Sequence, residues 1–176
     1  MQTNLTKLEA HLIAGNGYAI SVLNGKVFKI DSTHDNCFTA MDGLQVKAIN
    51  FEDIGKHFWI ACHPLSRITT EIEGIGVPIV ELLKNHSLID LGECVFEYWE
   101  EGGVYSVNAH DINSLGGSRC IDSLSYDGNV FKAMNNDYSF DAINPQDAIK
   151  DDFCAMGFDT RGFLERGLGK EITLKK

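Results

Sequence analysis

The chain has 176 residues, and 25 acidic against 15 basic side chains give it a net charge of −10 at pH 7. Apolar residues make up 44% of the chain, which is typical of a globular protein that is long enough to bury a substantial core. The negative charge repels a phosphate backbone and an anionic bilayer, so it argues against a nucleic-acid binder and against a membrane-surface protein. It would attract a basic partner, although many acidic proteins use their charge only for solubility.

Five cysteines, at positions 37, 62, 94, 120 and 154, are odd in number and form no Cys-x-x-Cys pair. Residues 1–7 lack the basic and apolar regions of a signal peptide, and no run of apolar residues is long enough for a membrane span. We therefore expect free thiols in a cytoplasmic protein.

The first strong local signal is Asn24-Gly25, which lies between two runs rich in β-branched and aromatic residues. Both residue types tolerate the positive φ of a tight type I′ turn, so the pattern predicts a hairpin over residues 18–30. A two-residue turn at this point pairs Val22 with Val27 and Ile20 with Lys29.

Other elements of the first half follow from spacing and turn residues. Leucines and isoleucine at helical spacing predict a helix within residues 4–14. Residues 31–43 are expected to form a polar loop. Its acidic residues have offsets similar to those of an EF-hand, but it lacks the required glycine and final glutamate, so calcium is not expected. Further predicted elements are strands at 44–50, 57–62 and 67–73 and a helix at 78–85.

The densest aromatic stretch is residues 94–107, where Gly102-Gly103 separates two β-rich arms and predicts a second hairpin. Asp127-Gly128 predicts a third hairpin, with arms at 119–124 and 129–134. Asn144-Pro145 predicts the start of a helix that runs to about residue 156 and ends at Gly157. The remaining expectations are loops at 113–118 and 135–141, a last helical turn at 160–166 and an edge strand or frayed tail at 169–176.

Hairpins, rather than strand–helix–strand crossovers, connect the predicted strands. This order predicts an α+β fold: a single antiparallel sheet with helices packed on it, in one globular domain over residues 1–176.

The hairpin at 94–107 is the main candidate for a functional surface. Alternation places Phe96 and Tyr98 on one face of its first arm and Val95, Glu97 and Trp99 on the other. Aromatic residues anchor interfaces, and carboxylates steer a basic partner. The alternative is a solvated edge above core aromatics. The candidate partner-binding residues are Glu97, Trp99, Glu100, Glu101 and Tyr105, together with the acidic loop residues Glu71, Glu73, Asp122 and Asp127.

A zinc site is the first chemical alternative. His34, Cys37, Cys62 and His63 are suitable ligands, but Cys62 and His63 are adjacent and would point to opposite faces of a strand. The spacing matches no closed zinc module, so we expect neither a metal nor another cofactor.

A small hydrolase is the second alternative. A cysteine with a histidine base, or a pair of carboxylates, could act as a catalytic site if the fold brought them together. No nucleophile elbow or phosphate-binding loop supports a specific reaction. The residues concerned are Cys94, Cys120 and Cys154 with His57, His63 or His110, the glutamates of the acidic hairpin, and the pair Glu71 and Glu73.

Through the hairpin at 18–30 and the acidic hairpin at 94–107, the chain resembles immunity proteins of contact-dependent growth inhibition. The resemblance implies a cytoplasmic antidote that binds the toxic C-terminal domain of its partner, often a nuclease with a basic active site. In some such proteins a toxin β-hairpin extends the sheet of the antidote. The leading hypothesis is therefore a non-catalytic inhibitor of a basic, nuclease-type toxin domain.

Overall fold

The computed structural model describes residues 4–15, 17–87, 89–113, 119–134, 140–142 and 146–172. Backbone contacts divide the chain into two compact units. Unit 1 comprises residues 1–64 and 151–176, and unit 2 comprises residues 65–150. The expectation of one domain over the whole chain stays a prediction.

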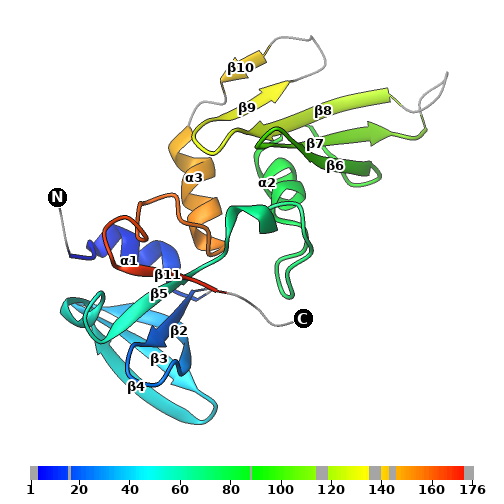
Figure 1. The fold of residues 1–176 in the computed structure, drawn as a ribbon. Coiled ribbons are helices and arrows are strands. Elements are labelled where there is room, and N and C mark those ends of the chain that lie inside the picture. Colours follow the sequence, from blue (N-terminus) through cyan, green and yellow to red (C-terminus); the bar gives the residue numbers. More distant parts are fainter. Residues whose placement is uncertain are drawn as a thin grey trace. The chain divides into compact units, whose positions relative to one another are not determined.

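Unit 1 is built on a six-stranded sheet (Figure 1). Its strands are β1 (Tyr18–Ser21), β2 (Val27–His34), β3 (Cys37–Asp42), β4 (Gln45–Asn50), β5 (Phe58–Cys62) and β11 (Gly169–Glu171). The spatial order is β11-β5-β1-β2-β3-β4, and every neighbouring pair is antiparallel except β11 with β5. A parallel pair needs a long connection, and here all of unit 2 lies between the two strands in the chain.

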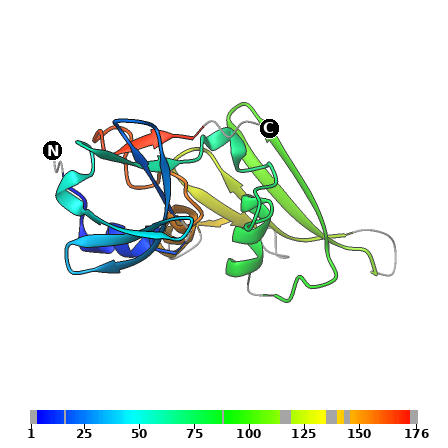
Figure 2. The same ribbon diagram turned by 90° about the horizontal axis from the view of Figure 1, so that it is seen from below.

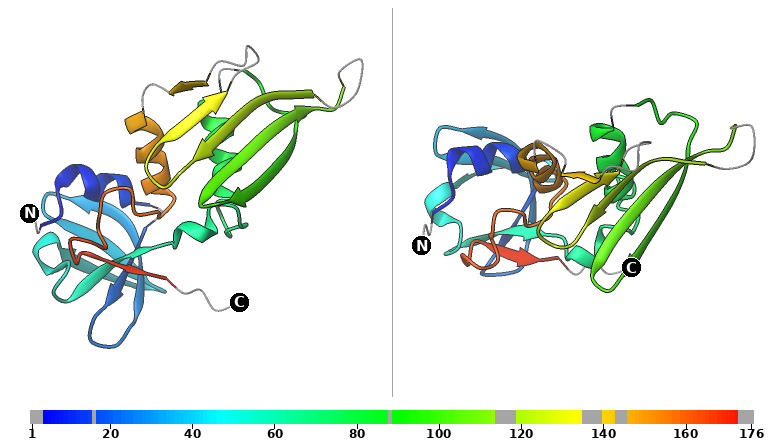
Figure 3. Two further views of the ribbon diagram at one scale, coloured as in Figure 1. Left: turned by 45° about the horizontal axis from the view of Figure 1, so that its top comes forward. Right: turned by 90° about the horizontal axis from the view of Figure 1, so that it is seen from above.

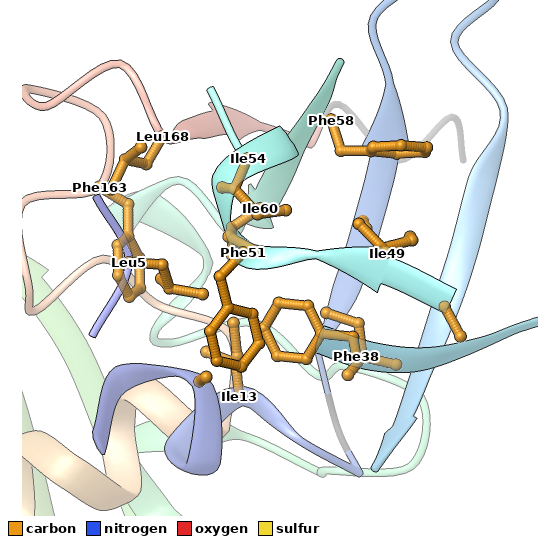
Figure 4. Packing of buried hydrophobic residues seen from close by; sticks show 14 of the residues in the cluster. Leu5, Ile13, Phe38, Ile49, Phe51, Ile54, Phe58, Ile60, Phe163 and Leu168 are labelled. Atoms are coloured by element: carbon orange, nitrogen blue, oxygen red, sulfur yellow. The ribbon is translucent and has the colours of Figure 1, made fainter. Parts of the chain in front are cut away.

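The core of unit 1 is aromatic and aliphatic (Figure 4). The rings of Phe38 and Phe51 lie 4.9 Å apart, and Phe28 meets Phe58 edge-on at 5.9 Å. Phe51 belongs to the short 3₁₀ helix η1 (Phe51–Asp53). Burial of such side chains is the main stabilising contribution to the unit.

A short helix, α1 (Lys7–Ile13), packs beside β2 and begins with a capping box. The Thr6 hydroxyl accepts from the Glu9 amide at 3.2 Å, and the Glu9 carboxylate accepts from the Thr6 amide at 2.8 Å. The buried side of the helix carries Ala10 and Ile13. The predicted helix is therefore present, within narrower bounds.

Glu9 also forms an ion pair with Arg166, which lies 157 positions later in the chain. One guanidinium nitrogen lies 2.5 Å from the carboxylate, and the other donates to the carbonyl of Asn4 at 2.8 Å. Both side chains are mostly buried, with exposed fractions of 13% for Arg166 and 11% for Glu9. The contact joins the two ends of unit 1.

The hairpin predicted at 18–30 exists, but its register differs by two residues. Ile20 pairs with Val27 and Tyr18 with Lys29. The Val22 amide donates to the His57 carbonyl at 2.9 Å instead of joining a ladder with β2. A five-residue connection, residues 22–26, therefore replaces the two-residue turn. Within it the Gly25 amide donates to the Ser21 carbonyl, and Gly25 has a positive φ of 69°.

The polar loop predicted at 31–43 is wrong, because most of these residues form the ends of β2 and β3. His34 pairs with Cys37 around a tight turn at Asp35-Asn36. Polar side chains of these strands alternate with buried Phe38 and Ala40, a pattern that composition alone conceals. The EF-hand-like offsets thus fall on a hairpin.

Unit 2 is built on a five-stranded antiparallel sheet in the order β10-β9-β8-β7-β6. Its strands are β6 (Val95–Glu101), β7 (Val104–Asp111), β8 (Arg119–Tyr126), β9 (Phe131–Met134) and β10 (Phe140–Ala142). The hairpin turn at Gly102-Gly103 lies as predicted. The third hairpin is also present, but its turn spans residues 127–130, so Asn129 and Val130 belong to the turn and not to the predicted second arm. The α+β class is confirmed, but two sheets, one of them mixed, replace the predicted single antiparallel sheet.

One face of this sheet is covered by α2 (Pro78–His86), which Figure 1, Figure 2 and Figure 3 show from four directions. Pro78 stands in its first turn, and Ile79, Val80, Leu82 and Leu83 are buried. The sheet contributes Val107, Ala109, Leu124 and Phe131 to the same core. The contacts of α2 are with β6, β7 and β8, so it covers the central and edge strands of this sheet on one face.

Two further expectations need correction. Residues 67–73 form no strand; the 3₁₀ helix η2 (Leu65–Arg67) and a series of turns occupy this region. Residues 160–166 form hydrogen-bonded turns, because Asp159 accepts from the Phe163 and Leu164 amides. The helix α3 (Gln146–Ala155) confirms the predicted helix, while Asn144 and Pro145 lie outside the described residues. Residues 114–118 and 135–139 of the predicted loops also lie outside them.

Candidate functional site: the acidic edge of the five-stranded sheet

The strand β6 lies at the edge of its sheet and pairs only with β7 among the described strands. Six of its seven residues are exposed. An edge strand presents unpaired backbone amides and carbonyls along its outer side, which another chain can pair with. With seven residues, β6 offers a longer edge for strand addition than β10, the three-residue strand at the other side of the sheet.

The two faces of β6 differ, and the predicted alternation is confirmed. Phe96 lies on the face that α2 covers, where the Lys84 ammonium stands 5.1 Å from its ring centre. Glu97 and Trp99 lie on the opposite face, in register with Asn108 and Ser106 of β7. The next strand continues these rows with Ser123 and Ser125. We call the resulting surface the open face; its residues are Glu97, Trp99, Ser106, Asn108, Ser123 and Ser125.

Trp99 is the largest side chain of the open face and is 38% exposed. The serine and asparagine residues beside it are half-buried. A partly exposed indole surrounded by hydrogen-bonding groups is typical of the anchor residues of protein interfaces. This polar row was not predicted from the sequence, although the two-residue spacing of Ser106 and Asn108, repeated by Ser123 and Ser125, could have indicated it.

The three glutamates of β6 have different surroundings. The Glu97 carboxylate lies 3.5 Å from Nε2 of His110, with 72% of its side chain exposed. Glu100 accepts from the Gly103 amide at 2.9 Å and so also stabilises the turn. Glu101 is exposed next to that turn, and its side chain has no hydrogen-bond or ion-pair partner among the described residues. The acidic edge is thus mainly solvated.

Tyr105 does not join the open face. It is half-buried, and it pairs in register with Tyr126, which is buried and stacks on Phe131 with ring centres 4.2 Å apart. Residues paired in register share a face of the sheet. Tyr105 therefore lies on the side of the core, opposite Trp99.

The acidic loop residues also separate. Glu71 and Glu73 are exposed in the turns before α2. Asp127 is exposed, but its carboxylate accepts from the amides of Val130 at 2.8 Å and Asn129 at 3.0 Å, and these bonds lower its pKa. Asp122 is only 8% exposed and accepts from the Ser87 hydroxyl and the Ser123 amide. The structure therefore does not support Asp122 as part of an exposed acidic surface.

The thiols have surroundings that disfavour nucleophilic chemistry. Cys120 stands opposite His110 in the sheet, but its thiol donates to the Asp122 carbonyl at 3.5 Å. Burial, and then the nearby Asp122 carboxylate, raises its pKa. Burial also raises the pKa of Cys94 and Cys62, and that of Cys154 to about 12. A reactive cysteine needs the opposite shift, because the thiolate is the nucleophile.

The proposed zinc ligands are not brought together. Cys37 lies on β3 and Cys62 on β5, with β1 and β2 between them in the sheet. The described residues contain no group of three or more His, Cys, Asp or Glu side chains placed to hold a metal ion. All five cysteines, each of which the structure describes, are free.

Comparison with known proteins finds no family model, no curated protein and no solved structure that matches this chain. Within the residues that the structure describes, no helix is both long enough and apolar enough to span a membrane.

Proposed function

We propose that the protein is a non-catalytic antidote that binds and neutralises a basic, nuclease-type toxin domain through β6 and the open face. The observation that carries this proposal is the combination, on one edge strand, of free backbone hydrogen-bonding groups, an exposed tryptophan and three glutamates. The glutamates of such a strand would attract a basic partner, the tryptophan would anchor it, and the free backbone groups would pair with one of its strands.

The distribution of charge supports the location. Unit 2 contains 14 acidic and 5 basic residues and has a net charge of −9, whereas unit 1 contains 11 acidic and 10 basic residues and has a net charge of −1. Nearly all of the field that would steer a basic partner therefore originates in unit 2. Steering of this kind acts on the association rate and weakens as salt is added.

The experiment uses the C-terminal domain encoded by the gene directly upstream, expressed in a host with and without this protein. The proposal expects that domain to arrest growth alone and growth to recover on co-expression. The purified pair should associate rapidly at low salt. Absence of both rescue and binding would overturn the proposal.

Charge reversal tests the surface. Replacing Glu97, Glu100 and Glu101 by lysine should slow association at least tenfold at low ionic strength, and much less near 1 M salt, where the Debye length is about 3 Å. The matched control reverses three exposed acidic residues of unit 1, Asp31, Glu52 and Glu165. Equal slowing in both triple variants would show that net charge, and not this edge, attracts the partner.

Trp99→Ala tests the anchor. We expect faster dissociation, equivalent to about 2 kcal/mol or more, with the fold retained. Tyr105→Ala is the matched comparison, because Tyr105 lies on the core side and should affect folding instead. Circular dichroism and dissociation rates measured on both variants separate the two roles. An unchanged dissociation rate for Trp99→Ala would remove the open face from the interface.

A further inference from the structure

A small pocket of unit 1 differs in chemical character from the acidic edge strand of unit 2. Its volume is about 220 Å³, and its walls come from α1, the end of β2, the Asp35-Asn36 turn and η1. The lining residues are Lys7, His11, Thr33, Asp35 and Phe51. Phe51 is 9% exposed, and its ring lies 4.9 Å from that of Phe38 (Figure 4).

Local structure holds these walls in place. Lys7 and His11 are four residues apart and therefore lie on one side of α1, which the Thr6–Glu9 capping box and Arg166 hold. Thr33 pairs in register with buried Phe38, so its side chain lies on the core side of the sheet. The Phe51 amide donates to the Asn36 carbonyl at 2.8 Å and ties η1 to the turn. These contacts fix the backbone of the pocket walls, whereas the side chains of Lys7, His11 and Asp35 are exposed.

The pocket has a positive and a negative wall that do not neutralise each other. Within the described part of the chain, the side chains of Lys7, His11 and Asp35 form no ion pair or hydrogen bond. Exposed charges gain little from pairing with each other, because water solvates them well. Here the two charges stay separate and face the same space.

The backbone at Asp35 positions its carboxylate. Asp35 has φ = 37° and is the only residue other than glycine with positive φ in the described ranges. Aspartate adopts positive φ more often than most other residues, so the tight turn with Asn36 needs no glycine here. The position therefore carries a carboxylate at the pocket wall.

We propose that this pocket binds a small zwitterion of amino-acid size. Its carboxylate would be bound by the Lys7 ammonium, with His11 and Thr33 as further hydrogen-bonding groups, and its ammonium group by Asp35. A simple anion would be repelled by Asp35, and a simple cation by Lys7. The volume is below the range of pockets for drug-sized ligands, which matches a ligand of a few heavy atoms.

The test titrates the full chain, labelled with ¹⁵N, with L-alanine, N-acetyl-L-alanine and L-alaninamide. These probes share one framework and differ in which charge they carry. The proposal expects saturable shifts of the Thr33 and Asp35 amides with L-alanine, and at least tenfold weaker binding of the two derivatives. Equal binding of L-alanine and N-acetyl-L-alanine would reduce the pocket to an anion site. No saturation by any probe at millimolar concentration would also overturn the proposal.

Two variants sharpen the result. Asp35→Asn keeps the side-chain volume and the tolerance of positive φ but removes the charge. The affinity for L-alanine should fall at least tenfold, while the affinity for N-acetyl-L-alanine should rise. A purely structural role of Asp35 would not change the two affinities in opposite directions. Lys7→Gln should lower the affinity for L-alanine. The control is Lys29→Gln, which replaces an exposed lysine on β2 and should leave that affinity unchanged. The pocket contains no residue of unit 2, so a negative result in this titration does not bear on the antidote proposal, which concerns β6 and the open face.

Discussion

The two units of this protein differ more in charge than in architecture. Both combine antiparallel strands with a helix, but unit 2 carries a net charge of −9 and unit 1 only −1. Unit 1 uses its charges locally, as in the Glu9–Arg166 pair, and buries a core rich in phenylalanine. Unit 2 exposes six of the seven residues of its acidic edge strand, β6. The difference teaches that net charge, a property of the whole sequence, reports mainly on one half of the molecule.

The largest expected effect comes from emptying either core. Phe38→Ala in unit 1 and Phe131→Ala in unit 2 each remove a ring that is 0% exposed and should cost about 3–5 kcal/mol of unfolding free energy. The chain has two tryptophans, Trp59 in unit 1 and Trp99 in unit 2, so their fluorescence can follow each unit in single-tryptophan variants. Urea unfolding should show whether each mutation moves only the signal of its own unit.

Coincident movement of both signals in both mutants would show that the units unfold as one cooperative domain. In that case the two units would differ in charge but would share one unfolding transition. It would also answer the prediction that residues 1–176 form a single domain.

The next effect concerns the ion pair of unit 1. Arg166→Met should destabilise the protein by about 3 kcal/mol at pH 7, because it leaves the mostly buried Glu9 carboxylate without its cation. Burial alone raises the pKa of Glu9, but the bonds from Arg166 and Thr6 outweigh it and lower the pKa below 4.5.

The pH dependence gives the sign of this effect. Since the folded pKa of Glu9 is lowered, its contribution is complete above pH 4.5 and is lost as the pH falls through the folded value. The difference in unfolding free energy between wild type and Arg166→Met should therefore shrink in acid. A difference that stays constant from pH 7 to pH 3 would contradict the ion-pair explanation.

A smaller effect is expected at the loop between β1 and β2. Gly25→Val should cost about 1–2 kcal/mol, because a β-branched residue resists the φ of 69° at that position. No other atom lies within 4 Å of a side chain added there, so the cost would come from the backbone alone. Gly25→Asn, which tolerates positive φ, is the control and should lose less. Thermal melts of both variants provide the measurement, and equal losses would refute the backbone argument.

The smallest effect should come from neutralising the acidic edge. Replacing Glu97, Glu100 and Glu101 by glutamine should change the unfolding free energy by no more than about 0.5 kcal/mol, since these side chains are exposed. Glutamine at position 100 can still accept from the Gly103 amide. A loss above 1.5 kcal/mol would show that the glutamates serve the fold rather than a partner.

Much of the local structure follows from the sequence. Turn residues with a strict conformational requirement, such as Gly102 and Gly103 with φ of 60° and 82°, placed the hairpins correctly. Pro78 and the apolar spacing after it located α2. Alternation along β6 separated Trp99 from Phe96, because side-chain direction in a strand depends only on position.

Other features depended on contacts between distant residues. The register of the first hairpin was decided by His57, which accepts from the Val22 amide, and the polar residues 31–43 became strands because Phe38 and Ala40 found a core. Asp122 and Tyr105 had the right chemistry for an interface, but burial removed Asp122 and the pairing with Tyr126 turned Tyr105 to the other face. The pocket at Lys7 and Asp35 joins α1 to a turn 28 positions later. Local propensity determines strands and turns, whereas the choice of sheet, face and neighbour is made only when the chain packs.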